Sequence, residues 1–422
     1  MTLLELTALF LSLVTVVGWA NAKFARLPTS VAMLGAGVVS AAGLLAAETL
    51  IEPFSGFSNV RALVGRLDFS QAVLNYMLAF LVFASGLQVD LRGLSQRRLP
   101  VWTLATIGVL VSTALVGFGL WAAAELLGHP IPLAWALTFG ALISPTDPIA
   151  VGAALKSGAV SPQLGAILQG EALFNDGVGF VTFTAMLAFA TSGDAPHPLW
   201  TTLDIVVEAG GGLVLGAVVA RVVGIFLRQI DDHVVETTGT IALAVGVYAL
   251  AQALHVSGPI AAAAAGLMVG EYGLKRGMSE ATRRAVEDFW GLVDEILNGL
   301  LFLLLGLQVF ILPFSSDEIG LWISAVALAI VARLVVVFPW GAFFNARRRE
   351  RGAAAVLTWG GLRGAVSLAL ALSIPHQPYR GTLLATTFVV VAFSVVIQGL
   401  TFLPMARRLR GATTTPAGGA AS

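Results

Sequence analysis

The sequence contains no cysteine, and only 11% of its 422 residues carry a charge. Without cysteine, disulfide bonds and thiolate metal sites are excluded. So small a charged fraction cannot cover a soluble globular protein, and 57% of the residues are hydrophobic. The formal net charge is zero, so no basic domain is available for a nucleic-acid partner. We therefore expect the partner of most of this surface to be a lipid bilayer.

Apolar runs of about 20 residues recur throughout the chain, and each is long enough to cross a membrane. We expect thirteen spans, at approximately 2–22, 30–50, 71–90, 99–127, 131–155, 162–191, 200–229, 234–254, 256–272, 285–312, 319–343, 352–374 and 381–406. The first lacks a basic leading segment and a cleavage site, so it is expected to be retained. The prediction is an all-α polytopic membrane protein with one transmembrane unit over 1–410 and a disordered cytoplasmic tail over 411–422.

Lysine and arginine are distributed unevenly over the expected loops. If the C-terminus is cytoplasmic, the cytoplasmic side holds 19 of the 24 basic residues. Only Arg61, Arg66 and Arg380 lie outside, while Arg333 and Arg363 fall within spans. Cytoplasmic loops are enriched in lysine and arginine, so we expect an inner-membrane protein whose N-terminus is outside.

The fifth span is interrupted by Ser144-Pro145-Thr146-Asp147-Pro148. Each proline lacks an N–H group, and each disfavours a helical conformation in the residue before it. We expect two half-helices with free carbonyls and Asp147 at the positive N-terminal end of the second. The alternative is a pair of ordinary proline kinks, which are common in membrane helices.

The twelfth span, seven spans later, is interrupted by Gly360-Gly361-Leu362-Arg363-Gly364. An offset of seven reverses the orientation, as an inverted repeat of spans one to six on eight to thirteen requires. Paired interruptions in the two halves are a sequence indicator of a transporter's binding site. Arg363 is placed to complement the negative C-terminal end of a half-helix.

The sixth span carries Glu171, Asn175 and Asp176 at a depth where ionisable groups are costly. Glu171 and Asn175 are four residues apart on one helical face, and Asp176 points into the neighbouring sector. Three glycines on this span allow another helix backbone to approach closely: Gly170, Gly177 and Gly179. Asp176 is the leading candidate to exchange a proton for a cation; the alternative is a hydrogen-bonded structural role.

Arg333 lies in the middle of the eleventh span and needs a partner there. Glu171 is the expected partner, and for this pair a structural role is favoured, because breaking a buried ion pair is costly. In the tenth span, Asp294, Glu295 and Asn298 give a weaker signal. They are expected either in a vestibule or at the ends of neighbouring helices.

At these positions the chain resembles the bacterial and archaeal sodium/proton antiporters related to animal sodium/proton exchangers. Four ordered motifs carry the resemblance: Gly140-Ala-Leu-Ile-Ser-Pro-Thr-Asp-Pro148, Gly170-Glu-Ala-Leu-Phe-Asn-Asp-Gly177, Phe289-Trp-Gly-Leu-Val-Asp-Glu-Ile-Leu-Asn298 and Trp359-Gly-Gly-Leu-Arg-Gly-Ala-Val-Ser367. The resemblance covers nearly the whole length of the chain.

The resemblance implies a homodimer in which two broken helices cross beside the ion. Its ion-binding core would comprise approximately 99–191 and 319–406, and its dimerisation scaffold 1–90 and 200–312. Asp176 would bind the proton and the cation in turn, with Thr146, Asp147 and Asn175 around it. Glu171 and Arg333 match the family's buried ion pair, and Arg363 matches its broken-helix arginine. The metal ligands would be Asp176, Asp147 and Thr146, and no cofactor is expected besides the transported Na⁺ and H⁺.

The expected activity is exchange of Na⁺, or Li⁺, for H⁺ by alternating access, serving pH and sodium homeostasis. Asn175-Asp176 supplies one carboxylate and not two adjacent acids, which favours electroneutral one-for-one exchange. The chain departs from the family at two places. Ala84-Ser85-Gly86 stands where some relatives carry an acid, which bears on the coordination shell and so on Na⁺ versus K⁺ or Li⁺ selectivity, and Gln308 stands where many carry Glu.

Other functions stay open at this point. A K⁺/H⁺ exchanger, or a transporter of an organic anion, would fit the same architecture. An ion channel would need a continuous hydrated path. An intramembrane enzyme would need its own catalytic residues, and the chain contains neither an HExxH nor a GxSxG motif.

Overall fold

The computed structural model describes residues 3–50, 77–193, 198–274, 277–348 and 352–411. The described chain is helical, and its only strand-like pairing is a single isolated bridge. The N-terminal half contains α1 (Leu3–Ala20), η1 (Asn21–Ala25), α2 (Thr29–Leu50), α5 (Leu78–Gln88), α6 (Leu91–Gln96), α7 (Arg98–Thr103), η3 (Leu104–Gly108), α8 (Val109–Leu126), α9 (Leu133–Ile143), α10 (Ile149–Lys156) and α11 (Pro162–Ser192).

The second half follows with α12 (Pro198–Leu227), α13 (His233–Ala253), α14 (Gly258–Met268), η4 (Val269–Leu274), α15 (Glu280–Leu307), η5 (Gln308–Phe310), η6 (Ser316–Glu318), α16 (Ile319–Arg348), α17 (Ala353–Trp359), α18 (Ala365–Leu372), α19 (Arg380–Phe393), η7 (Ser394–Gln398) and α20 (Gly399–Gly411). Among the described residues, eight helices are long and apolar enough to cross a membrane. This is a multi-pass membrane protein.

The helices follow the predicted spans closely, but the count of thirteen crossings stays a prediction. The expected span 71–90 begins among residues that the structure does not describe. The fifth and twelfth spans are each divided into two short helices. Of the expected tail, Gly411 ends α20, and 412–422 lie outside the described residues.

Several helices begin at a residue that caps free backbone N–H groups. Ser161, Ser257 and Ser279 precede α11, α14 and α15, and each accepts a hydrogen bond from the backbone three residues later. Asp232 precedes α13 and accepts from the N–H groups of Val235 and Val234, which lowers the pKa of its carboxyl. These caps fix where each helix starts after a loop.

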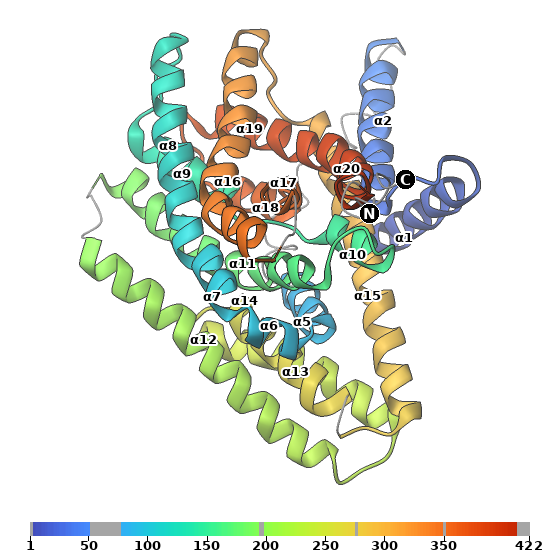
Figure 1. Ribbon diagram of the computed structural model, residues 1–422. Coiled ribbons are helices and arrows are strands. Elements are labelled where there is room, and N and C mark those ends of the chain that lie inside the picture. Colours follow the sequence, from blue (N-terminus) through green and yellow to red (C-terminus); the bar gives the residue numbers. More distant parts are fainter. Residues whose placement is uncertain (1–2, 51–76, 194–197, 275–276, 349–351, 412–422) are drawn as a thin grey trace, which may run out of the picture.

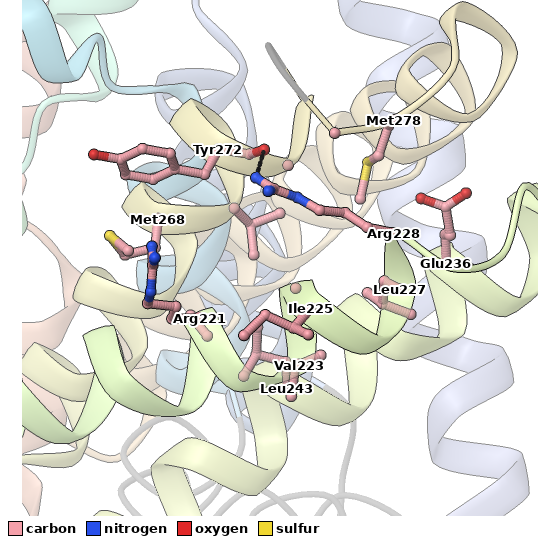
Figure 2. Close-up of a pocket in the computed structure, with 15 residues that line it drawn as sticks. Arg221, Val223, Ile225, Leu227, Arg228, Glu236, Leu243, Met268, Tyr272 and Met278 are labelled. Carbon is pink, nitrogen blue, oxygen red and sulfur yellow. Dashed lines mark hydrogen bonds between the residues drawn. The ribbon is translucent and has the colours of Figure 1, made fainter.

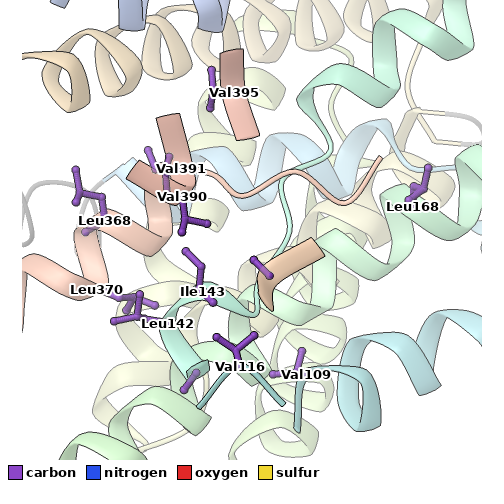
Figure 3. Packing of buried hydrophobic residues seen from close by; sticks show 14 of the residues in the cluster. Val109, Val116, Leu142, Ile143, Leu168, Leu368, Leu370, Val390, Val391 and Val395 are labelled. Atoms are coloured by element: carbon purple, nitrogen blue, oxygen red, sulfur yellow. The ribbon is translucent and has the colours of Figure 1, made fainter. Parts of the chain in front are cut away.

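The broken helices lie in the middle of the bundle. Figure 1 shows α11, α17 and α18 at its centre, with α9 next to α8, while α12 and α15 run along its edges. Side chains of α8, α9, α18 and α19 interlock around this centre (Figure 3) and include Val116, Ile143, Leu368 and Val391, all fully buried. Lipid tails are as apolar as the side chains they contact, so no hydrophobic driving force brings membrane helices together. Close packing supplies the association energy instead. The packing therefore fixes where the two interruptions meet.

Candidate ion-binding site

The two interruptions are joined directly to each other. The backbone N–H of Asp147 donates to the carbonyl oxygen of Leu362 at 2.8 Å, and the two residues form the isolated antiparallel bridge. Both breaks free backbone groups at a depth where water is absent, and such groups must find partners inside the protein. This hydrogen bond pairs a free N–H of the first interruption with a free carbonyl of the second. It also fixes how the two segments are aligned where they cross.

Arg363 occupies the carbonyl end of α9. Its Nη1 donates to the carbonyl oxygens of Ser144 and Pro145, the latter at 3.1 Å. Its backbone N–H donates to Ser394 Oγ at 2.7 Å, and Ser394 in turn donates to Gln398 Oε1. A guanidinium at a helix C-terminus offsets the negative end of the dipole. Arg363 therefore lies where the sequence placed it, and it compensates the end of α9 that Pro145 exposes.

Glu171 and Arg333 face each other in the interior, with exposed fractions of 2% and 5%. The contact is bidentate, and its Nη2 to Oε2 distance is 2.9 Å. Arg333 Nε also donates to the carbonyl oxygen of Leu357 in α17, at 3.1 Å. A side chain at Gly361 would overlap the Arg333 guanidinium. The pair thus ties α11 and α16 to the first half of the second broken helix.

A cavity of about 530 Å³ opens beside the crossing. Asp176, at the middle of α11, lines it together with Thr146 and Asp147 from the first interruption and Gly364 from the second. Among its described lining residues are three aspartates, and none is a lysine or an arginine. Charges of one sign in a low-dielectric cleft raise the local concentration of counter-ions. The cavity is therefore suited to cations.

The polar groups around Asp176 are arranged as possible ligands. Asn175 Nδ2 donates to Thr146 Oγ1 at 2.8 Å, which leaves Asn175 Oδ1 buried with no hydrogen-bond partner. No hydrogen bond or ion pair joins the Asp176 carboxylate to another described residue. At Gly364 any side chain would overlap Asp147 Oδ2, so the glycine allows this carboxylate to approach the second broken helix. Oxygen ligands of this kind suit hard cations.

The cavity extends to one side of the crossing only. It is lined by α5 along its length, by α10, by the first half of α11, by the middle of α15 and by the start of α18, and no lining residue comes from α9 or from α11 beyond Asp176. Gln88, Gln169 and Leu155 lie on this wall. The side to which it leads is that of the loops before α7, α11 and α15. Asp176 is therefore reached from one face of the membrane in this conformation.

Asp294 and Asn298 line the same cavity, although their place in the sequence was only a weak indication of a functional role. With Leu301 they form a stripe along α15 at spacings of four and three residues. That spacing could have indicated a shared face, but only the packing of α15 against α5 and α18 shows that the face lines the cavity. Glu295, their neighbour, is exposed and does not line it.

A second cavity, of about 80 Å³, lies away from the crossing, among α12, α13 and η4 (Figure 2). Its lining includes Arg221, Arg228 and Glu236. Arg228 Nη2 donates to the carbonyl oxygen of Tyr272 at 3.1 Å. None of the sequence-predicted site residues lines this cavity. It therefore belongs to the packing between these helices and not to the crossing.

Comparison with known proteins identifies the family. A sequence model described as "Sodium/hydrogen exchanger, transmembrane" matches residues 10–408. This chain belongs to the sodium/hydrogen exchanger family. It is 40% identical over 412 residues to the Na(+)/H(+) antiporter NhaP of Pseudomonas aeruginosa, covering 96% of this chain and 97% of that relative.

Other members of the exchanger family are similar over nearly the full length as well. The Na(+)/H(+) antiporter NhaH of Halobacillus aidingensis is 33% identical over 415 residues, with 95% of this chain and 96% of that protein covered. The solved structure of the sodium proton antiporter MjNhaP1 from Methanocaldococcus jannaschii at pH 8 superposes with a TM-score of 0.72 at 19% identity, covering 96% of this chain and 97% of the other. The exchanger fold is thus shared even where the sequence has diverged.

The buried pair generates a stability prediction. Glu171→Ala or Arg333→Ala should each lower the thermal unfolding temperature in detergent, because either strands a buried charge, at a cost of roughly 3–5 kcal/mol. The double variant should lose much less than the sum of the two. Glu280→Ala is the control, since Glu280 pairs with Arg284 on the exposed surface and should change little. Strictly additive losses from Glu171 and Arg333 would show that the contact is not energetically coupled.

Proposed function

We propose that this protein exchanges Na⁺ for H⁺ across the membrane by alternating access, with Asp176 as the group that binds each in turn. The observation that carries the proposal is a carboxylate at the middle of α11, at the inner end of a one-sided cavity and beside two interrupted helices. Membership of the exchanger family and the printed activity of its relatives support Na⁺ and H⁺ as the substrates. No cofactor enters this scheme.

The cation site would be built from Asp176, Asp147 and Thr146, with Asn175 beside them. Asn175 Oδ1 is the strongest structural support, because a buried carbonyl oxygen without a partner is costly unless a ligand completes it. Asp147 lies just before the N-terminus of α10, where the helix dipole favours its ionised form. Arg363 would keep the opposite helix end neutralised whether or not a cation is bound.

Competition for a single carboxylate would couple the two ions. Asp176 would be ionised with Na⁺ bound and would carry a proton when Na⁺ is absent. The site would change its access from one face of the membrane to the other with either a proton or Na⁺ on Asp176, and not with an unoccupied carboxylate. Both states carry the same net charge, so exchange would be electroneutral and one-for-one.

The orientation of this conformation follows from the charge distribution. The cavity leads to the side of the loops before α7, α11 and α15, and Arg97, Arg98 and Lys156 lie in or next to these loops. The positive-inside rule makes this side cytoplasmic, and the C-terminus with it. The structure described here would therefore be the inward-open state of a protein in the cell's inner membrane. A cavity that ends at the crossing favours alternating access over a channel.

The division into a moving core and a fixed scaffold is also a proposal. The cavity lies between α10, α11 and α18 on one wall and α5 and α15 on the other, as a boundary between core (99–191, 319–406) and scaffold (1–90, 200–312) requires. Several valines of α12 are exposed, including Val207, Val214 and Val218. We assign this scaffold face to contact with lipid or with the second subunit of a homodimer.

The Asp176→Asn variant tests the carrier assignment. The amide has the size of the carboxylate but cannot exchange a proton, so Na⁺-driven proton movement in proteoliposomes should fall below about a tenth of the wild-type rate. Asp288→Asn, the same change at an exposed position of α15, should leave the rate unaltered. Running Na⁺, K⁺ and Li⁺ in parallel identifies the cation. Exchange at the wild-type rate in a folded Asp176→Asn protein would rule the assignment out.

Stoichiometry is tested by clamping the membrane potential with K⁺ and valinomycin while Na⁺/H⁺ exchange is measured. One net charge per cycle would be driven by about 2.3 kcal/mol per 100 mV, so an electrogenic exchanger would respond steeply to voltage. We expect a rate that is indifferent to voltage. A steep dependence would mean that a second charge, with Asp147 as the first candidate, moves during the cycle.

A further inference from the structure

One buried hydroxyl group of the core has no protein partner. Ser112 lies in α8 and is 5% exposed, and its Oγ forms no hydrogen bond within the described residues. Other buried hydroxyls of the spanning helices donate to the carbonyl oxygen four residues earlier, as Thr138 and Thr182 do. Buried polar groups are almost always paired, so the Ser112 hydroxyl requires an explanation.

Ser112 lines a small cavity, of about 10 Å³, among the charged side chains of the core. Its other polar lining residues are Ser144, Glu171, Arg333 and Arg363. A buried water molecule needs at least roughly 10–15 Å³ of such space and two to four polar partners. The cavity therefore has polar partners for one water molecule and no room for a larger ligand.

The Arg363 guanidinium, which lines this cavity, has more donors than the protein uses. Its Nη1 donates to the carbonyl oxygens of Ser144 and Pro145, whereas neither Nε nor Nη2 donates to any residue of the described chain. Arg363 is 3% exposed, so bulk water reaches little of it. A guanidinium carries five N–H groups, and leaving such donors unpaired in the interior is costly. Arg363 thus needs an acceptor that the protein does not supply.

Glu171 lies near two arginines but contacts only one of them. Its carboxylate pairs with Arg333, and no ion pair in the part of the chain that the structure describes joins it to Arg363. Both Glu171 and Arg363 nevertheless line the same cavity. A carboxylate has about four acceptor positions, so Glu171 can accept a further hydrogen bond besides those from Arg333. A bridge across the cavity would let one acid offset both arginines.

We propose that this cavity is a binding site for one ordered water molecule. The water accepts a hydrogen bond from the Arg363 guanidinium and donates to Ser112 Oγ and the Glu171 carboxylate. Such a bridge is nearly as favourable as a direct hydrogen bond. It extends the Glu171–Arg333 pair to Arg363 and so ties α11, which carries Asp176, to α8 and to the second broken helix. The assignment does not depend on which ions the protein exchanges.

An experimental structure in which other buried waters are resolved tests the site directly. We expect one solvent peak within about 3.2 Å of Ser112 Oγ, of a Glu171 carboxylate oxygen and of an Arg363 guanidinium nitrogen. In Ser112→Ala the peak should weaken or disappear, since the water loses one of its three partners. A wild-type map without this peak would overturn the proposal.

The sign of the stability change in Ser112→Ala tests the same site independently. With the water bound, alanine removes a hydrogen bond, and the thermal unfolding temperature in detergent should fall by about 2 °C. Without it, alanine removes an unpaired hydroxyl, so the unfolding temperature would stay the same or rise. Ser324→Ala is the matched control and should change little, because the Ser324 hydroxyl donates to the Gly320 carbonyl of its own helix. An unfolding temperature of Ser112→Ala at or above that of the wild type would overturn the water site.

Discussion

The constraint on which this structure depends is that backbone groups freed inside a membrane must be satisfied by protein. Pro145 and Pro148 separate α9 from α10. The glycines around Arg363 separate α17 from α18 in the same way. The hydrogen bond from Asp147 to Leu362, and those from Arg363 to the end of α9, satisfy these groups mutually. Each break therefore supplies partners for the other.

Because the two breaks satisfy each other's polar groups, charged side chains can lie at a depth where lipid alone would make them costly. Arg363 and Arg333 neutralise the carbonyl end of α9 and the Glu171 carboxylate, which leaves no basic residue among the described residues that line the cavity. The three aspartates of the cavity consequently act on whatever ion enters it. The positive charges of the core have structural partners, and the cavity beside them is lined by negative charges.

Much of this arrangement could be predicted from particular residues. The prolines indicated the first break, three glycines flanking an arginine indicated the second, and one deep arginine required an acid that Glu171 provides. Local residue chemistry was sufficient in each case, because burial in a membrane leaves few ways to satisfy such groups. The spacing of the spans likewise gave the positions of most helices.

What the sequence could not give depends on packing between distant segments. The bridge between Asp147 and Leu362 and the Ser394 hydroxyl that accepts from Arg363 both follow from how helices cross, and no local pattern encodes them. The place of Asp294 was ambiguous for the same reason. A polar face on α15 could meet a vestibule, a helix end or solvent, and only its neighbours α5 and α18 decide among these.

The central claim is that one carboxylate, Asp176, binds Na⁺ and H⁺ in competition. Calorimetric titration of the purified protein with Na⁺, in buffers of different ionisation enthalpy, measures the protons released per cation bound. Competition predicts release of about one proton per Na⁺ at a pH where the empty site is protonated, declining as the pH rises. Na⁺ binding that released no proton at any pH would contradict the account.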